Sequence, residues 1–233
     1  MCEDGKAGPL RILVLVSGNG TNLQALIDAE KAGRFRTPEG TGKLSLVIAD
    51  RPGVYALERA AAAGISALTE ASSPDAPKAE QRRDLSDRLL RAAREEGIGL
   101  IILAGFLSIL EGEIVDEYAG RIINLHPALL PKYGGGGMYG ERVHRAVLAA
   151  GEAESGCTVH LVDAGTDTGP ILLQRRVPVL AGDTAETLAR RIHGEEHIAI
   201  VEATVLMIRR LCANPKGFAV FARGNDPGAL RGW

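Results

Sequence analysis

The stretch LRILVLVSGNGTNLQALIDA, residues 10–29, decides the fold that we expect for this chain. Residues 10–16 are short, apolar and rich in β-branched side chains, which is typical of a strand buried on both faces of a sheet. A loop with two glycines follows, and residues 22–32 then carry leucine and isoleucine at helical spacing before Gly33. A buried strand that leads through a glycine-rich loop into a helix predicts the first unit of a parallel α/β sheet.

The same alternation of strand and helix patterns recurs as far as residue 125. We expect further strands at residues 44–49, 65–68, 99–104 and 121–125. We expect helices at residues 55–63 and 79–96, with a surface loop at residues 72–78. This alternation predicts an α/β fold with a doubly wound, mostly parallel sheet of the Rossmann-like kind and right-handed crossovers.

The pattern changes in the second half of the chain. Residues 158–162 and 171–179 have the pattern of two strands spanned by a loop at 163–170, which predicts an antiparallel C-terminal extension of the sheet. Residues 184–211 form a long helical stretch, and the remaining tail is rich in glycine and proline.

Composition and charge exclude several classes of protein. The 233 residues are 45% hydrophobic and 24% charged, as in an average globular protein, and the net charge of −2 gives no field that would recruit nucleic acid or an anionic membrane. No apolar run approaches the roughly 20 residues needed to cross a bilayer, and residues 1–9 lack the apolar core of a signal peptide. The three cysteines, Cys2, Cys157 and Cys212, are odd in number and far apart, which favours a reducing cytoplasm.

The first glycine-rich loop, residues 17–22, predicts a phosphate site. Its glycines let the backbone approach an anion, and the following helix N-terminus offers free N–H groups, with Thr21 and Asn22 as further donors or helix caps. The loop is neither a Walker loop nor a complete dinucleotide fingerprint, because Leu23 occupies the third glycine position and Asp50 lies further on than the usual ~20 residues. A tight strand–helix turn without a ligand is the alternative.

A second polar pattern, Asn124-Leu125-His126-Pro127, ends the strand predicted at residues 121–125. Alternate residues of a strand point to the same side, so Asn124 and His126 would face one reacting atom together. Pro127 cannot donate to a strand ladder and ends the strand. The amide could hold an oxyanion while the imidazole moves a proton, which suggests acyl-group chemistry.

Other polar residues are ambiguous. His193, Glu196 and His197 match the H-x-x-E-H pattern of a zinc site, but the match is short and includes Gly194, so we expect a charged helix face with one useful carboxylate. Asp167 lies in a loop and would act only if it reached His126 in space. We expect the isolated His144 and His160 to be structural, with His144 following a flexible glycine loop.

Four segments together resemble the phosphoribosylglycinamide formyltransferase family, folate-dependent enzymes of purine biosynthesis. The segments are residues 16–25, 103–107, 123–133 and 167–171, and the resemblance covers about residues 10–210. The Asn-x-His-Pro segment marks the wider formyltransferase superfamily, and the Ser-Gly-Asn-Gly-Thr-Asn loop narrows the match to the glycinamide ribonucleotide enzyme or a close relative.

The resemblance implies a role for three groups of residues. The catalytic residues would be Asn124, His126 and Asp167, with Asp167 raising the pKa of the histidine. The ribonucleotide and its phosphate would be held by Gly20, Thr21, Asn22 and Glu196. The folate would be held by Arg82, Leu107, Ser108, Ile109, Leu110 and Asn124, mostly through the backbone of residues 107–110.

The implied reaction is formyl transfer from 10-formyltetrahydrofolate, as co-substrate, to the amine of glycinamide ribonucleotide, with Asn124 and protonated His126 holding the oxyanion and no metal required. We expect a monomer or weak homodimer that acts on these small molecules and not on nucleic acid or membrane. The catalytic domain would span residues 10–212, with a phosphate-binding half (10–110) and a catalytic and folate-binding half (111–212), between a tail at 1–9 and an extension at 213–233.

Two departures from the family and three rival functions accompany this interpretation. Ser108 stands where many members carry Arg, which affects the expected folate affinity, and residues 134–140 form an expanded glycine loop that we expect to be a mobile flap.

A formyltetrahydrofolate hydrolase usually has an N-terminal regulatory domain, whereas nine residues precede the first strand here. A formyltransferase for another amine would lack the phosphate loop or carry a basic domain, and a non-catalytic dinucleotide-binding module would leave Asn124 and His126 unexplained.

Overall fold

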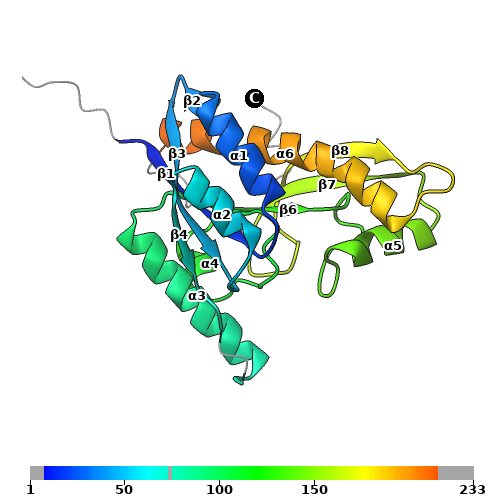
Figure 1. The fold of residues 1–233 in the computed structure, drawn as a ribbon, viewed down its shortest axis with the longest axis horizontal. Coiled ribbons are helices and arrows are strands. Elements are labelled where there is room, and N and C mark those ends of the chain that lie inside the picture. The colour runs from blue at the N-terminus through cyan, green and yellow to red at the C-terminus, as the bar shows by residue number, and fades with distance from the viewer. Residues whose placement is uncertain (1–7, 73–74, 215–233) are drawn as a thin grey trace, which may run out of the picture.

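The computed structural model describes residues 8–72 and 75–214 (Figure 1). The strands are β1 (Leu10–Val16), β2 (Arg36–Thr37), β3 (Gly40–Ala49), β4 (Ser66–Thr69), β5 (Leu100–Leu103), β6 (Ile122–His126), β7 (Glu154–Leu161) and β8 (Ile171–Pro178). The helices are α1 (Thr21–Lys31), α2 (Tyr55–Ala62), α3 (Lys78–Glu95), α4 (Glu113–Glu117), α5 (Glu141–Ala149) and α6 (Ala185–Ala213). The tail at 1–9 and the extension at 213–233 fall almost wholly outside the described residues.

One sheet organises the molecule. Strands β4, β3, β1, β5 and β6 lie side by side in that order and are parallel, and β7 and β8 continue the sheet in antiparallel pairs. The chain winds from β1 outward through β3 to β4, then crosses back to β5 and β6 on the other side of β1. The predicted fold, doubly wound and mostly parallel with an antiparallel C-terminal extension, is confirmed.

Helices cover both faces of the sheet, and each face has its own apolar core. On one face α1, α2, α5 and α6 pack against the strands through residues such as Leu26, Ala56 and Ile200, all fully buried. On the other face α3 and α4 contribute Leu89 and Ile114 to a second core (Figure 1). Neighbouring residues of a parallel strand face opposite cores: Val14 lies in the first and Leu13 in the second. Burial on both faces explains why these strands read as continuous apolar runs.

The structure adds three short elements that the sequence patterns did not predict. Strand β2 forms a small antiparallel hairpin with the start of β3, so β3 begins four residues before the predicted strand. Helix α4 has five residues, too few to show a helical period. Helix α5 does carry a period, since Val143 and Val147 are buried four residues apart, and this signal was available directly after the glycine loop.

In the part of the chain that the structure describes, no helix combines the length and the apolar character required to cross a membrane.

Candidate active site

A large cavity of about 1610 Å³ opens at the carboxyl ends of the parallel strands, where the chain reverses its winding direction. Such a switch point is where open α/β sheets bind ligands. Every site residue expected from the sequence lines this cavity. They are Gly20, Thr21, Asn22, Arg82, Leu107, Ser108, Ile109, Leu110, Asn124, His126, Asp167 and Glu196.

The loop between β1 and α1 forms one end of the cavity. Gly20 precedes the first residue of α1 and has a φ of 72°, and no side chain of the described residues caps the helix there. Thr21 and Asn22 therefore occupy the first helical turn instead of capping it, which corrects the capping role that we expected. A helix N-terminus without a side-chain cap leaves N–H groups available to an anion.

Asn22 is joined to α6 through a buried carboxylate. The Glu196 side chain accepts a hydrogen bond from His193 Nδ1 at 2.8 Å, and Asn22 Nδ2 lies 3.5 Å from the same oxygen. This contact raises the pKa of His193 and favours its charged form. Asn22 Oδ1 is buried without a hydrogen-bond partner among the described residues, so it remains available to a ligand. The amide and carboxylate thus form a polar wall beside the first loop.

The H-x-x-E-H pattern on α6 contributes to this wall. His193 and Glu196 bind each other, and His197 lies one turn further along, with its pKa lowered by burial. Within residues 8–72 and 75–214, no group of three His, Cys, Asp or Glu side chains has the arrangement of a metal site. The pattern is accounted for by the partnership of Glu196 with His193 and Asn22.

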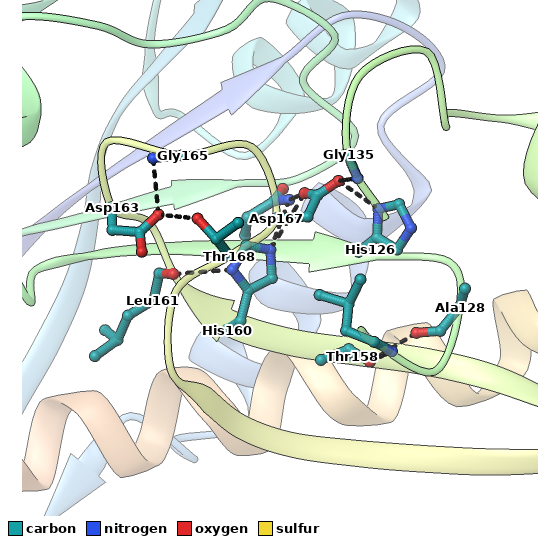
Figure 2. Close-up of polar contacts among 12 residues, drawn as sticks. His126, Ala128, Gly135, Thr158, His160, Leu161, Asp163, Gly165, Asp167 and Thr168 are labelled. Atoms are coloured by element: carbon teal, nitrogen blue, oxygen red, sulfur yellow. Dashed lines mark hydrogen bonds and ion pairs between the residues drawn. The ribbon is translucent and has the colours of Figure 1, made fainter. Parts of the chain in front are cut away.

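Asn124 and His126 end β6 and face the cavity together, as their alternation predicted. His126 Nε2 lies 2.8 Å from the backbone carbonyl of Tyr133, and Nδ1 lies 3.4 Å from Asp167 Oδ2 (Figure 2). A carbonyl can only accept, so its partner Nε2 carries the proton of the neutral ring and Nδ1 is the nitrogen that titrates. The approach of Asp167 to His126, which spacing alone could not establish, is therefore present.

The pKa of His126 differs from the expected direction. Burial lowers it below the ordinary value of 6.5, although the charge of Asp167 and the Tyr133 carbonyl both favour the protonated ring. Asp167 thus has the expected raising influence, but it does not outweigh the loss of solvation. The lowered pKa favours the neutral imidazole before the reaction, so the protonated His126 expected beside the oxyanion would have to gain its proton during the reaction.

Asp167 lies between two histidines and holds a left-handed backbone conformation, with a φ of 58° (Figure 2). Its Oδ2 accepts the N–H of Gly135 at 3.0 Å, and its Oδ1 lies 3.5 Å from His160 Nε2. Burial alone would raise the pKa of Asp167, but contacts with His160, His126 and Gly135 lower it below the ordinary value. The carboxylate is therefore ionised at neutral pH.

His160 lines the same cavity, and the structural role expected for it stays a prediction. It pairs with Asn124 across β6 and β7, and its Nε2 lies 3.1 Å from Asn124 Nδ2. Its Nδ1 donates to the Leu161 carbonyl at 2.8 Å, so Nε2 accepts the amide hydrogen of Asn124. The second amide hydrogen points to Asp167 Oδ1 at 3.3 Å. The β6–β7 register brings His160 to Asn124, and no short motif reveals that register.

His144 also faces the cavity. It lies in α5, is 3% exposed, and burial lowers its pKa. Its Nδ1 has no hydrogen-bond partner in the described part of the chain. His144 follows the glycine loop, as expected, and the structural role expected for it stays a prediction.

The segment after β5 lines the cavity beside the first loop. The N–H of Leu107 donates to Ser17 Oγ at 2.8 Å, which ties this segment to the first loop. Ser108 donates its hydroxyl to Asp50 at 2.8 Å, and Asp50 also accepts from Arg51. Asp50 is thereby engaged with protein partners and does not stand free as a ribose ligand. Arg82 lines the cavity from α3.

The second glycine-rich loop, residues 134–140, also lines the cavity. Gly135 donates to Asp167, and Met138 donates to the Gly135 carbonyl at 3.1 Å. Arg142 stacks on the ring of Tyr139, with 4.9 Å between the guanidinium carbon and the ring centre. The predicted opening and closing of this loop stays a prediction.

Comparison with known proteins identifies relatives of this chain. The profile of the Formyl transferase family matches residues 10–204. The trifunctional purine biosynthetic protein adenosine-3 of Drosophila pseudoobscura pseudoobscura is 47% identical over 198 residues, which are 84% of this chain and 14% of that protein. The chain therefore spans only a small part of such trifunctional relatives.

Single-function relatives match over most of their length. The phosphoribosylglycinamide formyltransferase of Escherichia coli K12 is 38% identical over 81% of this chain and 82% of its own length. The crystal structure of glycinamide ribonucleotide transformylase 1 from Symbiobacterium toebii superimposes with a TM-score of 0.78 and 40% identity, covering 88% of this chain and 90% of that one.

Proposed function

The chain belongs to the formyl transferase family, and on that premise we propose that it transfers the formyl group of 10-formyltetrahydrofolate to the amine of glycinamide ribonucleotide. The products are formylglycinamide ribonucleotide and tetrahydrofolate, and the reaction is a step of de novo purine biosynthesis. The observation that carries this proposal is the position of the Asn124, His126 and Asp167 cluster in one cavity, together with a helix N-terminus and the segment at 107–110.

His126 is the proton carrier. The amine attacks the formyl carbon, the carbonyl electrons move onto oxygen, and the attacking nitrogen must lose a proton. Neutral Nδ1 accepts that proton, directly or through a water molecule, because Nε2 is held by the Tyr133 carbonyl. The imidazolium is stabilised by Asp167, 3.4 Å away, and returns the proton to N10 of the folate as the carbon–nitrogen bond breaks.

Asn124 stabilises the oxyanion, with the newly charged His126 beside it. Both amide hydrogens of Asn124 already have acceptors, His160 at 3.1 Å and Asp167 at 3.3 Å. The hydrogen bond to Asp167 is the longer of the two. Exchanging it for a hydrogen bond to the oxyanion therefore sacrifices less stabilisation than exchanging the bond to His160. His160 keeps the amide in place during that exchange. A donor that is oriented before the reaction contributes about 10²–10³-fold in rate.

Two neighbouring parts of the cavity lining bind the two substrates. The phosphate of the ribonucleotide binds at Gly20, Thr21 and Asn22, where the helix N-terminus favours an anion, and Glu196 accepts from the ribonucleotide. The folate binds along residues 107–110, with Asn124 at its reacting end and Arg82 available to a carboxylate. Because Ser108 is tied to Asp50, its side chain contributes little, and the backbone of this segment makes the contacts.

Three further statements belong to the same proposal. The half at 10–110 carries the phosphate loop and, unlike in the predicted division, also the folate-binding segment at 107–110; the half at 111–212 carries the catalytic residues. The protein acts in the cytoplasm, which agrees with Cys157 and Cys212 being free thiols. It acts as a monomer or weak homodimer on small molecules, not on nucleic acid or a membrane, and requires no metal.

The test combines an activity assay with one variant. Purified protein is mixed with 10-formyltetrahydrofolate, and loss of the formyl group is followed with and without glycinamide ribonucleotide. We expect turnover only with the nucleotide, and its complete loss in His126→Ala with nucleotide binding retained. Arg145→Ala, an exposed change on α5, serves as the control. Turnover without the nucleotide identifies a hydrolase instead, and full activity of His126→Ala refutes the mechanism.

A further inference from the structure

The carbonyl of Tyr133 determines which nitrogen of His126 can move a proton. It accepts His126 Nε2–H at 2.8 Å and leaves Nδ1 to titrate beside Asp167. If this carbonyl turned away, the hydrogen bond that fixes the proton on Nε2 would be lost. The neutral ring could then carry its proton on either nitrogen. The conformation of one peptide unit therefore matters to the proposed chemistry.

That conformation is unfavourable for a tyrosine. Tyr133 has a φ of 57°, in the left-handed region, where a residue with a Cβ costs about 1–2 kcal/mol. Such a conformation persists when surrounding contacts hold it, and strained residues gather at functional sites. The contacts that hold Tyr133 in place are accordingly part of the site, even where they lie outside the substrate cavity.

Glu152 supplies the main polar contact of the tyrosine side chain. The Tyr133 hydroxyl donates to Glu152 Oε1 at 2.9 Å, and Lys132 Nζ donates to the same oxygen at 2.8 Å. The bonds from Lys132 and Tyr133 lower the pKa of Glu152, so the carboxylate is charged at neutral pH. A hydrogen bond to an ionised acceptor is roughly twice as strong as one between neutral groups.

These residues lie on the far side of the chain from the substrates. Lys132, Tyr133 and Glu152 line a second pocket of about 350 Å³ and do not line the substrate cavity. Tyr133 links the second pocket to the substrate cavity, because its carbonyl is bonded to His126, which lines the cavity, and its hydroxyl to Glu152. A change at Glu152 can reach the catalytic histidine without touching either substrate.

We propose that Glu152 is a positioning residue for His126, acting through the hydroxyl and the left-handed backbone of Tyr133. This role rests on the proposed formyl transfer, in which His126 carries the proton. The charged and titratable groups that act on His126 from other elements are Asp167, His160 and Glu196, and all three are unchanged by substitutions at Glu152.

Three variants test the proposal by kinetics. Tyr133→Phe and Glu152→Ala each remove the hydroxyl–carboxylate bond, and we expect kcat to fall about tenfold while KM for both substrates changes less than twofold. Glu152→Gln keeps an acceptor oxygen and retains kcat within about threefold. The double variant loses no more than the worse single variant, because both changes break one contact. Glu154→Ala is the control, since Glu154 lines the same pocket but pairs with Arg176.

A second measurement reads the ring of His126 directly. Nitrogen-15 NMR of histidine-labelled protein reports which nitrogen carries the proton, whether or not the enzyme turns over. We expect the Nε2–H tautomer in the native protein and in Glu154→Ala, and a mixture of tautomers in Tyr133→Phe and Glu152→Ala. A native tautomer in Glu152→Ala overturns the positioning role regardless of the activity. An absence of formyl transfer in the native protein overturns the proposed function and leaves this readout intact.

Discussion

Two glycine-rich loops line one cavity, and the space around their glycines differs. In the loop at 17–22, a Cβ on Gly20 would come within 2.7 Å of the Ala56 side chain and 2.9 Å of its backbone. In the loop at 134–140, a Cβ on Gly135, Gly136 or Gly137 would meet no described atom within 4 Å. Space is therefore lacking at Gly20 in the first loop, whereas Gly135, Gly136 and Gly137 at the centre of the second have open space; the second loop is crowded only where it begins, at Gly134, whose Cβ would come within 2.5 Å of the Leu130 side chain.

The two loops also differ in what holds them. The first is fixed from several sides: Gly18 accepts the N–H of Ala56, and Arg59 donates to the carbonyl of Asn19 at 2.9 Å. The second relies on Asp167, through the N–H of Gly135, and Asp167 is also a partner of His126. Loops of similar composition are therefore held differently: the first by several contacts with α2 and the second by the carboxylate of Asp167.

The largest effect is expected for Gly20→Ala. The new methyl group must displace Ala56, and alanine must adopt a φ of 72°, so we expect a loss of about 3 kcal/mol in the free energy of unfolding. We also expect the KM for glycinamide ribonucleotide to rise at least tenfold, by about 1.4 kcal/mol. Urea unfolding and steady-state kinetics measure both. Gly18→Ala, whose Cβ meets no described atom within 4 Å, is the matched control; equal losses in both variants would contradict the packing explanation.

Asp167→Asn removes the charge that links the second loop to His126. We expect kcat to fall about 10²-fold, because the imidazolium loses its counter-charge. The reaction needs neutral His126, so its rate falls as pH drops through the pKa of that residue, which already lies below 6.5. Loss of the Asp167 charge lowers this pKa further, and the acidic limb of the kcat/KM profile moves to lower pH. A shift to higher pH would show that another group controls the limb.

The smallest effects are expected within the second loop. Gly137 has a φ of 87°, so Gly137→Ala costs about 1 kcal/mol in unfolding free energy from backbone strain alone. Gly136→Ala, next to it and without a positive φ, changes stability by less than about 0.5 kcal/mol. Thermal unfolding of the pair measures the difference. Losses near 3 kcal/mol in both variants would mean that this loop is packed like the first.

Local patterns were sufficient for much of the fold. The apolar runs of the parallel strands, the helical spacing that follows them and the alternation of the two are short-range features, and they predicted the sheet and its antiparallel extension. The patterns missed β2 and α4 because two and five residues are too few to show a period. Helix α5 was missed although Val143 and Val147 carried its period, because the preceding glycines suggested a loop.

The candidate site also has features that local patterns predicted and features that they could not predict. Asn124 and His126 share a strand, so their common direction followed from the sequence. The positions of Asp167, His160 and Glu152 did not, because each depends on register or packing between segments far apart in the chain. His160 reaches Asn124 only through the antiparallel pairing of β6 with β7. The direction in which the pKa of His126 shifts could not be predicted from the sequence either, because burial is a property of the folded chain.

The sequence by itself determined the α/β architecture, the glycine-rich connection between the first strand and the first helix, and the pairing of an amide with an imidazole at one strand end. These depend on periodicity and residue type over a few positions. Only the tertiary structure decided that burial lowers the pKa of His126, that His160 holds Asn124, and that Tyr133 fixes the proton on Nε2. Desolvation and hydrogen bonding depend on distances of a few ångströms, and folding alone sets those distances between residues far apart in sequence.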